Sequence, residues 1–198
     1  MPRAALPSGI DIEYATFGDA ARPTLLLVNG YTSQMIVWEQ VLLDALVAQG
    51  LHVVIYDNRD VGLSTKLDGQ RVSPAMVLKA TLAGEEPPPV PYTLSDMAAD
   101  GIGLLDALGI ERAHVVGASM GGMIVQLMAI NHADKLLTMT SIMSTTGAPH
   151  LPPPTEEAEQ RLRNLAIGEA ASDREQAIRD RGFYPESMQR HLMAIFKV

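Results

Sequence analysis

The segment from Val115 to Gly122 places one serine between glycines at a fixed spacing. Gly117, Ser119 and Gly121 fit the pattern G-x-S-x-G, in which a serine occupies a sharp turn between a strand and a helix. Glycine is needed on both sides because the backbone passes so closely that a side chain would collide. We predict Ser119 as a nucleophile with an exposed hydroxyl. The next amide, that of Met120, begins a helix and is placed to stabilise an oxyanion.

Two other glycine motifs compete with this interpretation, and each fails at a specific residue. A phosphate-binding P-loop requires lysine directly after Gly122, where the chain has Met123. A dinucleotide-binding fingerprint requires glycine at position 119, where the chain has Ser119. That fingerprint also normally follows the first strand of its unit, whereas this segment comes late in the chain. The pattern therefore favours a nucleophile over a phosphate cradle.

Short apolar runs predict the strands that must carry this serine. Three runs lack polar alternation, which is typical of parallel strands buried on both faces: Thr24–Asn29, His52–Asp57 and Ala113–Gly117. A fourth run, Leu136–Met143, is interrupted by threonine and serine. The stretch Ile10–Phe17 alternates as an antiparallel edge strand would.

Helical patterns separate these runs. An apolar stripe over residues 38–46 ends before the stop signal Gly50, and a second helix extends from its N-cap Thr93 to Gly109. The segment Met120–Ile130 is apolar on nearly all sides, which indicates a helix buried inside the domain. Strands alternating with helices predict an α/β fold, with a mostly parallel sheet and helices on both faces.

Two proline clusters, at residues 87–91 and 149–154, predict extended connectors. After the second cluster the chain becomes charged and helical in pattern, and no further buried strand is evident. We therefore predict two parts: an α/β core over residues 1–148 and a partial helical cap over residues 149–198.

These motifs together resemble the α/β-hydrolase superfamily, in the branch of esterases, cofactor-free haloperoxidases and polyketide methylesterases. The resemblance extends over about residues 8–148. The run Leu25–Tyr31 resembles the family's strand followed by His-Gly-x, with Asn29 in place of histidine. The run Asp57–Ser64 resembles the loop D-x-R-G-x-G-x-S, with Asp60 in place of a glycine. The stretch Tyr92–Gly109 resembles the family's helix that precedes the nucleophile strand.

The resemblance implies hydrolysis of a small-molecule carboxylic ester through an acyl-serine, with the amides of Tyr31 and Met120 as the oxyanion donors. It implies a methyl ester as substrate and neither cofactor nor metal. Perhydrolysis by the same serine, as in cofactor-free haloperoxidases, is one alternative, and a non-catalytic binding or interaction module is another. We expect Asp57, Arg59 and Ser64 to brace their loop. Met35 and Met120 are candidates to line an apolar pocket.

An activated serine needs a histidine base and an acid that orients it, which in this fold follow in the order Ser, Asp or Glu, His. The positions after Leu136–Met143 are Ser144, Thr145 and Thr146, so no carboxylate is found there. His191 has the right chain order but lies in the predicted cap. We expect the chain to stop within the cap, before both residues. It would then be weakly active or inactive, with a sheet edge at Leu136–Met143 open to self-association.

The composition narrows the classes of partner. The chain has 198 residues and a net charge of −8, which argues against nucleic acid and anionic membranes. It has no cysteine, so disulfides and thiolate metal sites are excluded. No stretch approaches the roughly 20 apolar residues of a membrane span, and no signal peptide is evident. We expect a cytoplasmic protein.

Overall fold

The computed structural model describes residues 2–31, 33–70, 73, 76, 79–80, 83, 85–86, 88–148, 150–152, 155–158, 190–191 and 194–195. The predicted core, residues 1–148, is described over most of its length. Most of the predicted cap, residues 149–198, lies outside the described residues, so the cap stays a prediction. Within the described ranges, no helix combines the length and the apolar character that a membrane crossing requires.

Six strands form one sheet in the order β1-β2-β4-β3-β5-β6. The neighbours β4, β3, β5 and β6 run parallel, whereas β2 is antiparallel to both β1 and β4. The bounds are β1 (Arg3–Ala5), β2 (Asp11–Phe17), β3 (Thr24–Val28), β4 (His52–Tyr56), β5 (Ala113–Ala118) and β6 (Leu136–Ile142). The mostly parallel sheet predicted from the apolar runs is confirmed.

The position of β2 differs from the prediction. The run Ile10–Phe17 is antiparallel as expected, but it is not the edge of the sheet. β1 pairs outside it, with Arg3 opposite Glu13 and Ala5 opposite Asp11. A strand of three residues is too short to show alternation in the sequence, so its pairing is decided by tertiary contacts.

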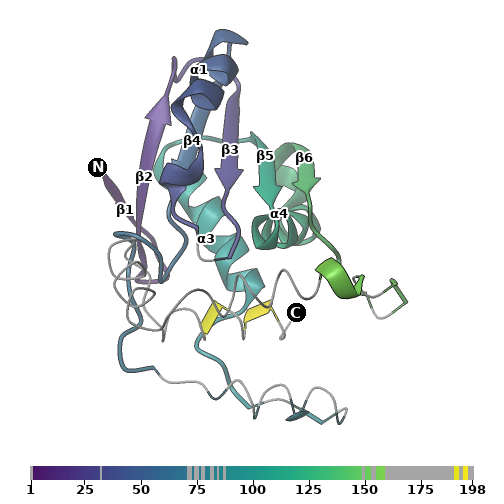
Figure 1. Ribbon diagram of the computed structural model, residues 1–198. Helices are drawn as coiled ribbons and strands as arrows, with labels where there is room; N and C mark the ends of the chain where they lie inside the picture. The colour runs from purple at the N-terminus through teal and green to yellow at the C-terminus, as the bar shows by residue number, and fades with distance from the viewer. Residues whose placement is uncertain are drawn as a thin grey trace, which may run out of the picture.

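Helices cover both faces of the sheet (Figure 1). α1 (Gln40–Ala48) lies on one face, and α3 (Leu94–Ala107) and α4 (Met120–Asn131) lie on the other. Two short 3-10 helices, η1 (Met35–Val37) and η2 (Ala133–Lys135), precede α1 and β6. Thr93 caps α3 as predicted, in a reciprocal capping box with Asp96.

Alternate residues of the central strand divide between two cores. Leu26 and Val28 of β3 pack in the larger core with α3 and α4, whereas Leu25 and Leu27 pack beneath α1. This division follows from the two-residue period of a strand, which points successive side chains to opposite faces. All five residues of β3 are buried, so the loop that follows β3 starts from a rigid position.

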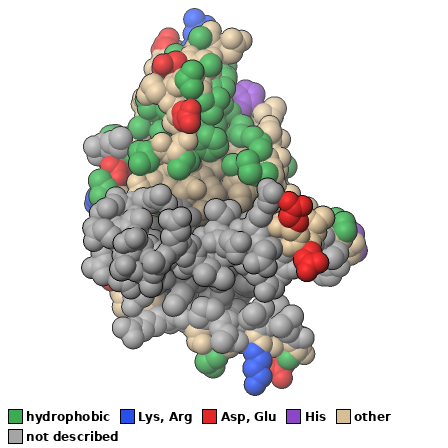
Figure 2. All heavy atoms as spheres, viewed as in Figure 1, with side chains coloured by type: hydrophobic (Ala, Val, Ile, Leu, Met, Phe, Trp, Pro, Cys, Tyr) green, Lys and Arg blue, Asp and Glu red, His purple; other side chains and the backbone are tan. Residues whose placement is uncertain are grey.

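The face that carries α1 is rich in exposed apolar side chains. Figure 2 shows hydrophobic side chains gathered over the region of α1. In η1, Ile36 and Val37 are exposed, and in α1, Val41 and Leu42 are exposed. The outer surface of η1 and α1 therefore presents apolar groups to solvent, while the sheet residues beneath α1 are buried.

β6 forms the sheet edge opposite β1. Only Leu136 of its seven residues is buried. Leu137, Met139 and Ile142 are 42%, 40% and 41% exposed, so this strand departs from the burial typical of a parallel strand. The exposed edge predicted at Leu136–Met143 is present in the described part of the chain. Its self-association stays a prediction.

Candidate active site

Ser119 lies on a sharp bend between the end of β5 at Ala118 and the start of α4 at Met120. Its backbone has φ 56° and ψ −121°, a combination that residues with a side chain rarely adopt. The Ser119 amide donates to the carbonyl of Ile142 at 2.9 Å, which ties the bend to the end of β6. The residue is exposed. The strained backbone therefore presents the hydroxyl at the carboxyl end of the parallel strands.

The two glycines of the pattern are required by close backbone packing. A Cβ at Gly117 would overlap the carbonyl of Gly121, within the first turn of α4. A Cβ at Gly121 would overlap the carbonyl of Val28 and lie 2.7 Å from the carbonyl of Asn29. Backbone atoms cannot move aside as a flexible side chain can. The glycines therefore let β5, α4 and the end of β3 meet at the bend.

Replacing Gly121 with alanine is expected to destabilise the protein by about 2–3 kcal/mol, because the new methyl group overlaps two carbonyl oxygens. Gly103→Ala in α3 is the matched control, since a Cβ there meets Leu6 at an ordinary 3.4 Å. That change should stabilise the helix by about 0.5–1 kcal/mol. Urea unfolding measures both values. A Gly121→Ala protein as stable as the parent would contradict the close packing.

The loop after β3 passes directly beside Ser119. A Cβ at Gly30 would lie 3.1 Å from the Cβ of Ser119 and 3.6 Å from its Oγ. Tyr31 is the next residue, half-buried against the larger core. Met120 is the first residue of α4, where backbone amides have no partner within the helix. The structure thus brings Gly30, Ser119 and Met120 together, with Tyr31 adjacent, and the oxyanion roles of Tyr31 and Met120 stay predictions.

Asn29, which replaces the family's histidine, connects the ends of two central strands. Its Nδ2 donates to the carbonyl of Tyr56 at 3.1 Å. Its own carbonyl accepts from Nδ2 of Asn58 at 3.3 Å. The side chain is 1% exposed, so these bonds form in the interior. Asn29 therefore holds the loop of Gly30 against the end of β4.

Buried hydrogen bonds hold the loop after β4. Asp57 Oδ1 accepts from the amide of Met35 at 2.6 Å. Ser64 Oγ donates to the Asp57 carbonyl at 2.6 Å and accepts from the Glu13 amide at 2.9 Å. Burial raises the pKa of Asp57. The bracing role predicted for Asp57 and Ser64 is confirmed.

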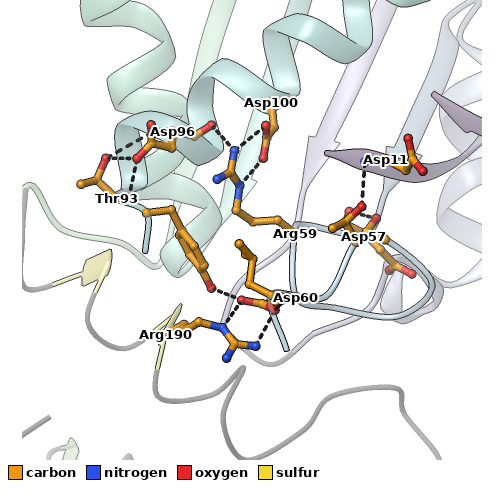
Figure 3. Close-up of polar contacts among 12 residues, drawn as sticks. Asp11, Asp57, Arg59, Asp60, Thr93, Asp96, Asp100 and Arg190 are labelled. Atoms are coloured by element: carbon orange, nitrogen blue, oxygen red, sulfur yellow. Dashed lines mark hydrogen bonds and ion pairs between the residues drawn. The ribbon is translucent and has the colours of Figure 1, made fainter. Parts of the chain in front are cut away.

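Arg59 joins the same loop to α3 through a buried ion pair with Asp100 (Figure 3). Its Nε and Nη2 donate to the two carboxylate oxygens at 2.5 and 2.7 Å. The guanidinium also lies over the ring of Tyr92, 5.2 Å from the centroid. Burial alone would lower the pKa of Arg59, but the hydrogen bonds and charge of Asp100 outweigh it and raise the pKa. Arg59 therefore also braces the loop.

Asp60 adopts a left-handed backbone with φ 67° and is fully buried. Its carboxylate accepts from Arg190 Nε and Nη2, each at 2.7 Å, from Tyr92 Oη at 2.8 Å and from the Leu67 amide at 2.9 Å (Figure 3). Burial alone would raise the pKa of Asp60, but the hydrogen bonds and charge of Arg190 help to lower it. Sequence reasoning missed Arg190. The sequence did contain one signal: Asp60 replaces a glycine in this loop, and a buried carboxylate requires a cation as its partner.

The histidines outside the predicted cap lie away from the bend. His52 is the first residue of β4 and His114 is the second residue of β5, and each forms a hydrogen bond with a threonine of the neighbouring strand. His132 follows α4 at the helix end opposite Ser119. Within the described residues, the Ser119 hydroxyl makes no hydrogen bond to another side chain. In the described part of the chain, therefore, no side chain is hydrogen-bonded to this serine as a base.

The pocket role considered for two methionines is wrong. Met35 and Met120 are each 2% exposed and belong to the two hydrophobic cores. Their apolar side chains gain more by packing against the sheet than by facing solvent. Met120 contributes its amide to the bend, while its side chain anchors the start of α4.

Strand order, helices on both faces and the strained serine after β5 together define an α/β protein of the hydrolase type. The chain also matches the family model described as alpha/beta hydrolase fold over residues 23–181. The chain therefore belongs to the α/β-hydrolase fold family.

Curated relatives and solved structures agree with this assignment. The chain is 34% identical over 126 residues to a rhodomycin D methylesterase of Streptomyces peucetius, covering 64% of this chain and 36% of that protein. It is 30% identical over 126 residues to 3-oxoadipate enol-lactonase 2 of Acinetobacter baylyi, covering 64% and 39%. These matches thus span between 36% and 39% of the relatives' own length.

Among solved structures, the enol-lactonase from Burkholderia xenovorans LB400 superposes with a TM-score of 0.66 at 24% identity, covering 100% of this chain and 74% of that chain. A hydrolase from Pseudomonas aeruginosa PA01 superposes with a TM-score of 0.68 at 21% identity, covering 100% and 72%. At these identities the superpositions establish the fold alone.

Proposed function

We propose that this protein is a carboxylic ester hydrolase in which Ser119 is the nucleophile. The observation that carries the proposal is the strained, exposed position of Ser119 beside Gly30. The Ser119 oxygen attacks the ester carbonyl carbon, and the alcohol leaves with the serine proton. Water then hydrolyses the acyl-serine and releases the acid. The amides of Tyr31 and Met120 stabilise the negative oxygen formed in each step.

A methyl ester of a mid-sized apolar acid is the proposed substrate. The similarity to the methylesterase of Streptomyces peucetius supports a methyl ester. The similarity to the enol-lactonase of Acinetobacter baylyi supports ester hydrolysis in general, because lactones are cyclic esters. Perhydrolysis needs no different nucleophile: hydrogen peroxide in place of water would convert the same acyl-serine into a peracid.

A second candidate is a binding or interaction module with an unactivated serine. The observation that favours it is the Ser119 hydroxyl, which has no hydrogen-bonded base within the described residues. Without such a base, a serine keeps little more than the residual help of the oxyanion amides. Ester turnover would then be close to that of a protein lacking the hydroxyl.

Labelling with a fluorophosphonate probe and hydrolysis of a p-nitrophenyl ester together separate the two candidates. Ser119→Ala is expected to abolish labelling and to reduce turnover to background, because the hydroxyl forms the covalent bond. Ser95→Ala on the exposed first turn of α3 is the matched control and should behave as the parent. Equal turnover in the parent and Ser119→Ala, with no label on either, would reject the esterase and support the module.

A further inference from the structure

The loop after β4 binds two consecutive residues from the far end of the chain. Arg190 is 1% exposed and forms a bidentate ion pair with Asp60, which is 0% exposed. Arg190 Nη1 also donates to the carbonyl of Gln70 at 3.0 Å. These partners are 130 and 120 residues away in sequence. The ion pair therefore fixes residues 190–191 against the core of the hydrolase.

Arg190 holds this segment in place, and the neighbouring His191 contacts two aromatic rings. Its Nε2 lies 2.7 Å from the carbonyl oxygen of Arg59, and a carbonyl only accepts, so Nε2 carries the hydrogen. The imidazole packs edge-on to Tyr92, with centroids 5.9 Å apart. It also packs against Tyr31, with centroids 6.4 Å apart and planes tilted by 49°.

Tyr31 directly follows Gly30, which lies beside Ser119, so the His191 contact reaches the loop of the proposed oxyanion donor. Burial lowers the pKa of His191 to about 4, and the imidazole is therefore neutral at pH 7. Because burial disfavours the charged form of this imidazole, His191 is poorly suited to take and hold the serine proton. Its geometry suits support of the Tyr31 loop instead.

We infer that His191, held in place by the Asp60–Arg190 ion pair, is a positioning residue for Tyr31 and its backbone amide. The inference rests on the proposed function, since it assigns His191 to the oxyanion site of that reaction. The path runs from Asp60 to Arg190, to the ring of His191 and then to the ring of Tyr31. An amide moved by about 1 Å is enough to lower a rate by about 100-fold.

Two replacements at position 191 distinguish the contribution of the imidazole ring from that of its hydrogen bond to Arg59. His191→Gln keeps an amide donor that reaches the Arg59 carbonyl but loses the ring, whereas His191→Phe keeps a ring and loses the donor. Asp106→Ala, which breaks the exposed pair with Lys135, is the remote control. In all proteins, fluorophosphonate labelling gives the maximal rate and the half-saturating concentration separately. Fluorine NMR of 3-fluorotyrosine protein reports the ring of Tyr31, assigned with Tyr31→Phe.

His191→Gln is expected to lower the maximal labelling rate by about 10- to 100-fold at unchanged half-saturation and to shift the Tyr31 signal. His191→Phe and Asp106→Ala should keep the parent rate within about threefold. A folded His191→Gln protein with the parent's Tyr31 signal would overturn the inference. So would a labelled His191→Gln protein with the parent's rate.

The NMR measurement keeps the inference separate from the proposed function. If the parent is never labelled, the esterase proposal fails, while the Tyr31 signal still decides whether His191 positions that ring. If His191→Gln does not fold, a fluorine–proton Overhauser effect between Tyr31 and His191 in the parent decides instead. Its presence supports the contact, and its absence overturns it.

Discussion

Replacing Asp100 with alanine is expected to lower the free energy of unfolding by about 3–5 kcal/mol, because the Arg59 guanidinium stays buried without its carboxylate. Asp100 is 3% exposed and Arg59 is 7% exposed, so water cannot replace the lost partner. Arginine also cannot become neutral by losing its proton. The Tyr92 ring that lies under the guanidinium compensates only a small part of the lost charge interaction.

Urea unfolding followed by circular dichroism measures this loss as a shift in midpoint at constant slope. Asp106→Ala is the matched control, because it removes the carboxylate of an exposed ion pair on the same helix. Little change is expected there, since solvent screens such pairs. The double variant Arg59→Met, Asp100→Leu should recover most of the lost stability by packing apolar groups in the same space. An Asp100→Ala midpoint equal to that of Asp106→Ala would refute the argument.

The central strands and the bend were predictable because their signals are local. Apolar runs without alternation identify β3, β4 and β5. β3 and β4 are buried on both faces as predicted, whereas every second residue of β5 is only half-buried. The bend at Ser119 needs glycines two residues to either side, and the backbone clashes at Gly117 and Gly121 show why. Both signals lie within about eight residues of the feature they predict.

The features that sequence reasoning missed depend on partners far along the chain. Asp60 and Arg190 are 130 residues apart, and neither has a neighbouring residue that indicates the other. The edge position of β1 depends on the register of Arg3 opposite Glu13. The burial of Met35 is decided by the packing of η1 on the sheet. In each case tertiary contacts determine the outcome. The replacement of a glycine by Asp60 indicates that a cation is needed, but the local pattern does not identify which residue supplies it.

Acid is expected to destabilise the protein through His191, with a loss of about 2–3 kcal/mol between pH 7 and pH 4.5. The folded protein holds the pKa of His191 at about 4, below the value of 6.5 for an exposed histidine. In this window the unfolded chain binds a proton that the folded protein does not. The stability that His191 contributes is therefore complete above pH 6.5 and is lost as pH falls towards 4.

The charged groups around His191 keep this direction. Burial is the main cause of the low pKa of His191, and the charges of Arg190 and Arg59 lower it further, while the charge of Asp60 and the Arg59 carbonyl oppose them. The pKa of Asp60 is itself lowered, so this carboxylate stays ionised through the window. The Asp60–Arg190 ion pair, which positions His191, therefore persists over this pH range. Keeping the imidazole neutral meanwhile costs more free energy as pH falls.

Comparison with His191→Gln isolates this contribution, because every other titrating group is common to both proteins. His52, whose pKa burial lowers, adds to the acid loss, and Asp57, whose pKa burial raises, opposes it in both. Urea unfolding at pH 7.0, 6.0, 5.0 and 4.5 gives the free energy of unfolding of each protein. Over this range the parent should lose about 2–3 kcal/mol more than His191→Gln, so the two values approach each other as pH falls. If the free energies of unfolding of the two proteins instead fall in parallel with pH, His191 takes up its proton in the folded state at its ordinary pKa. The imidazole would then be hydrated rather than packed between Tyr31 and Tyr92, and its role in placing the Tyr31 loop would fail with it.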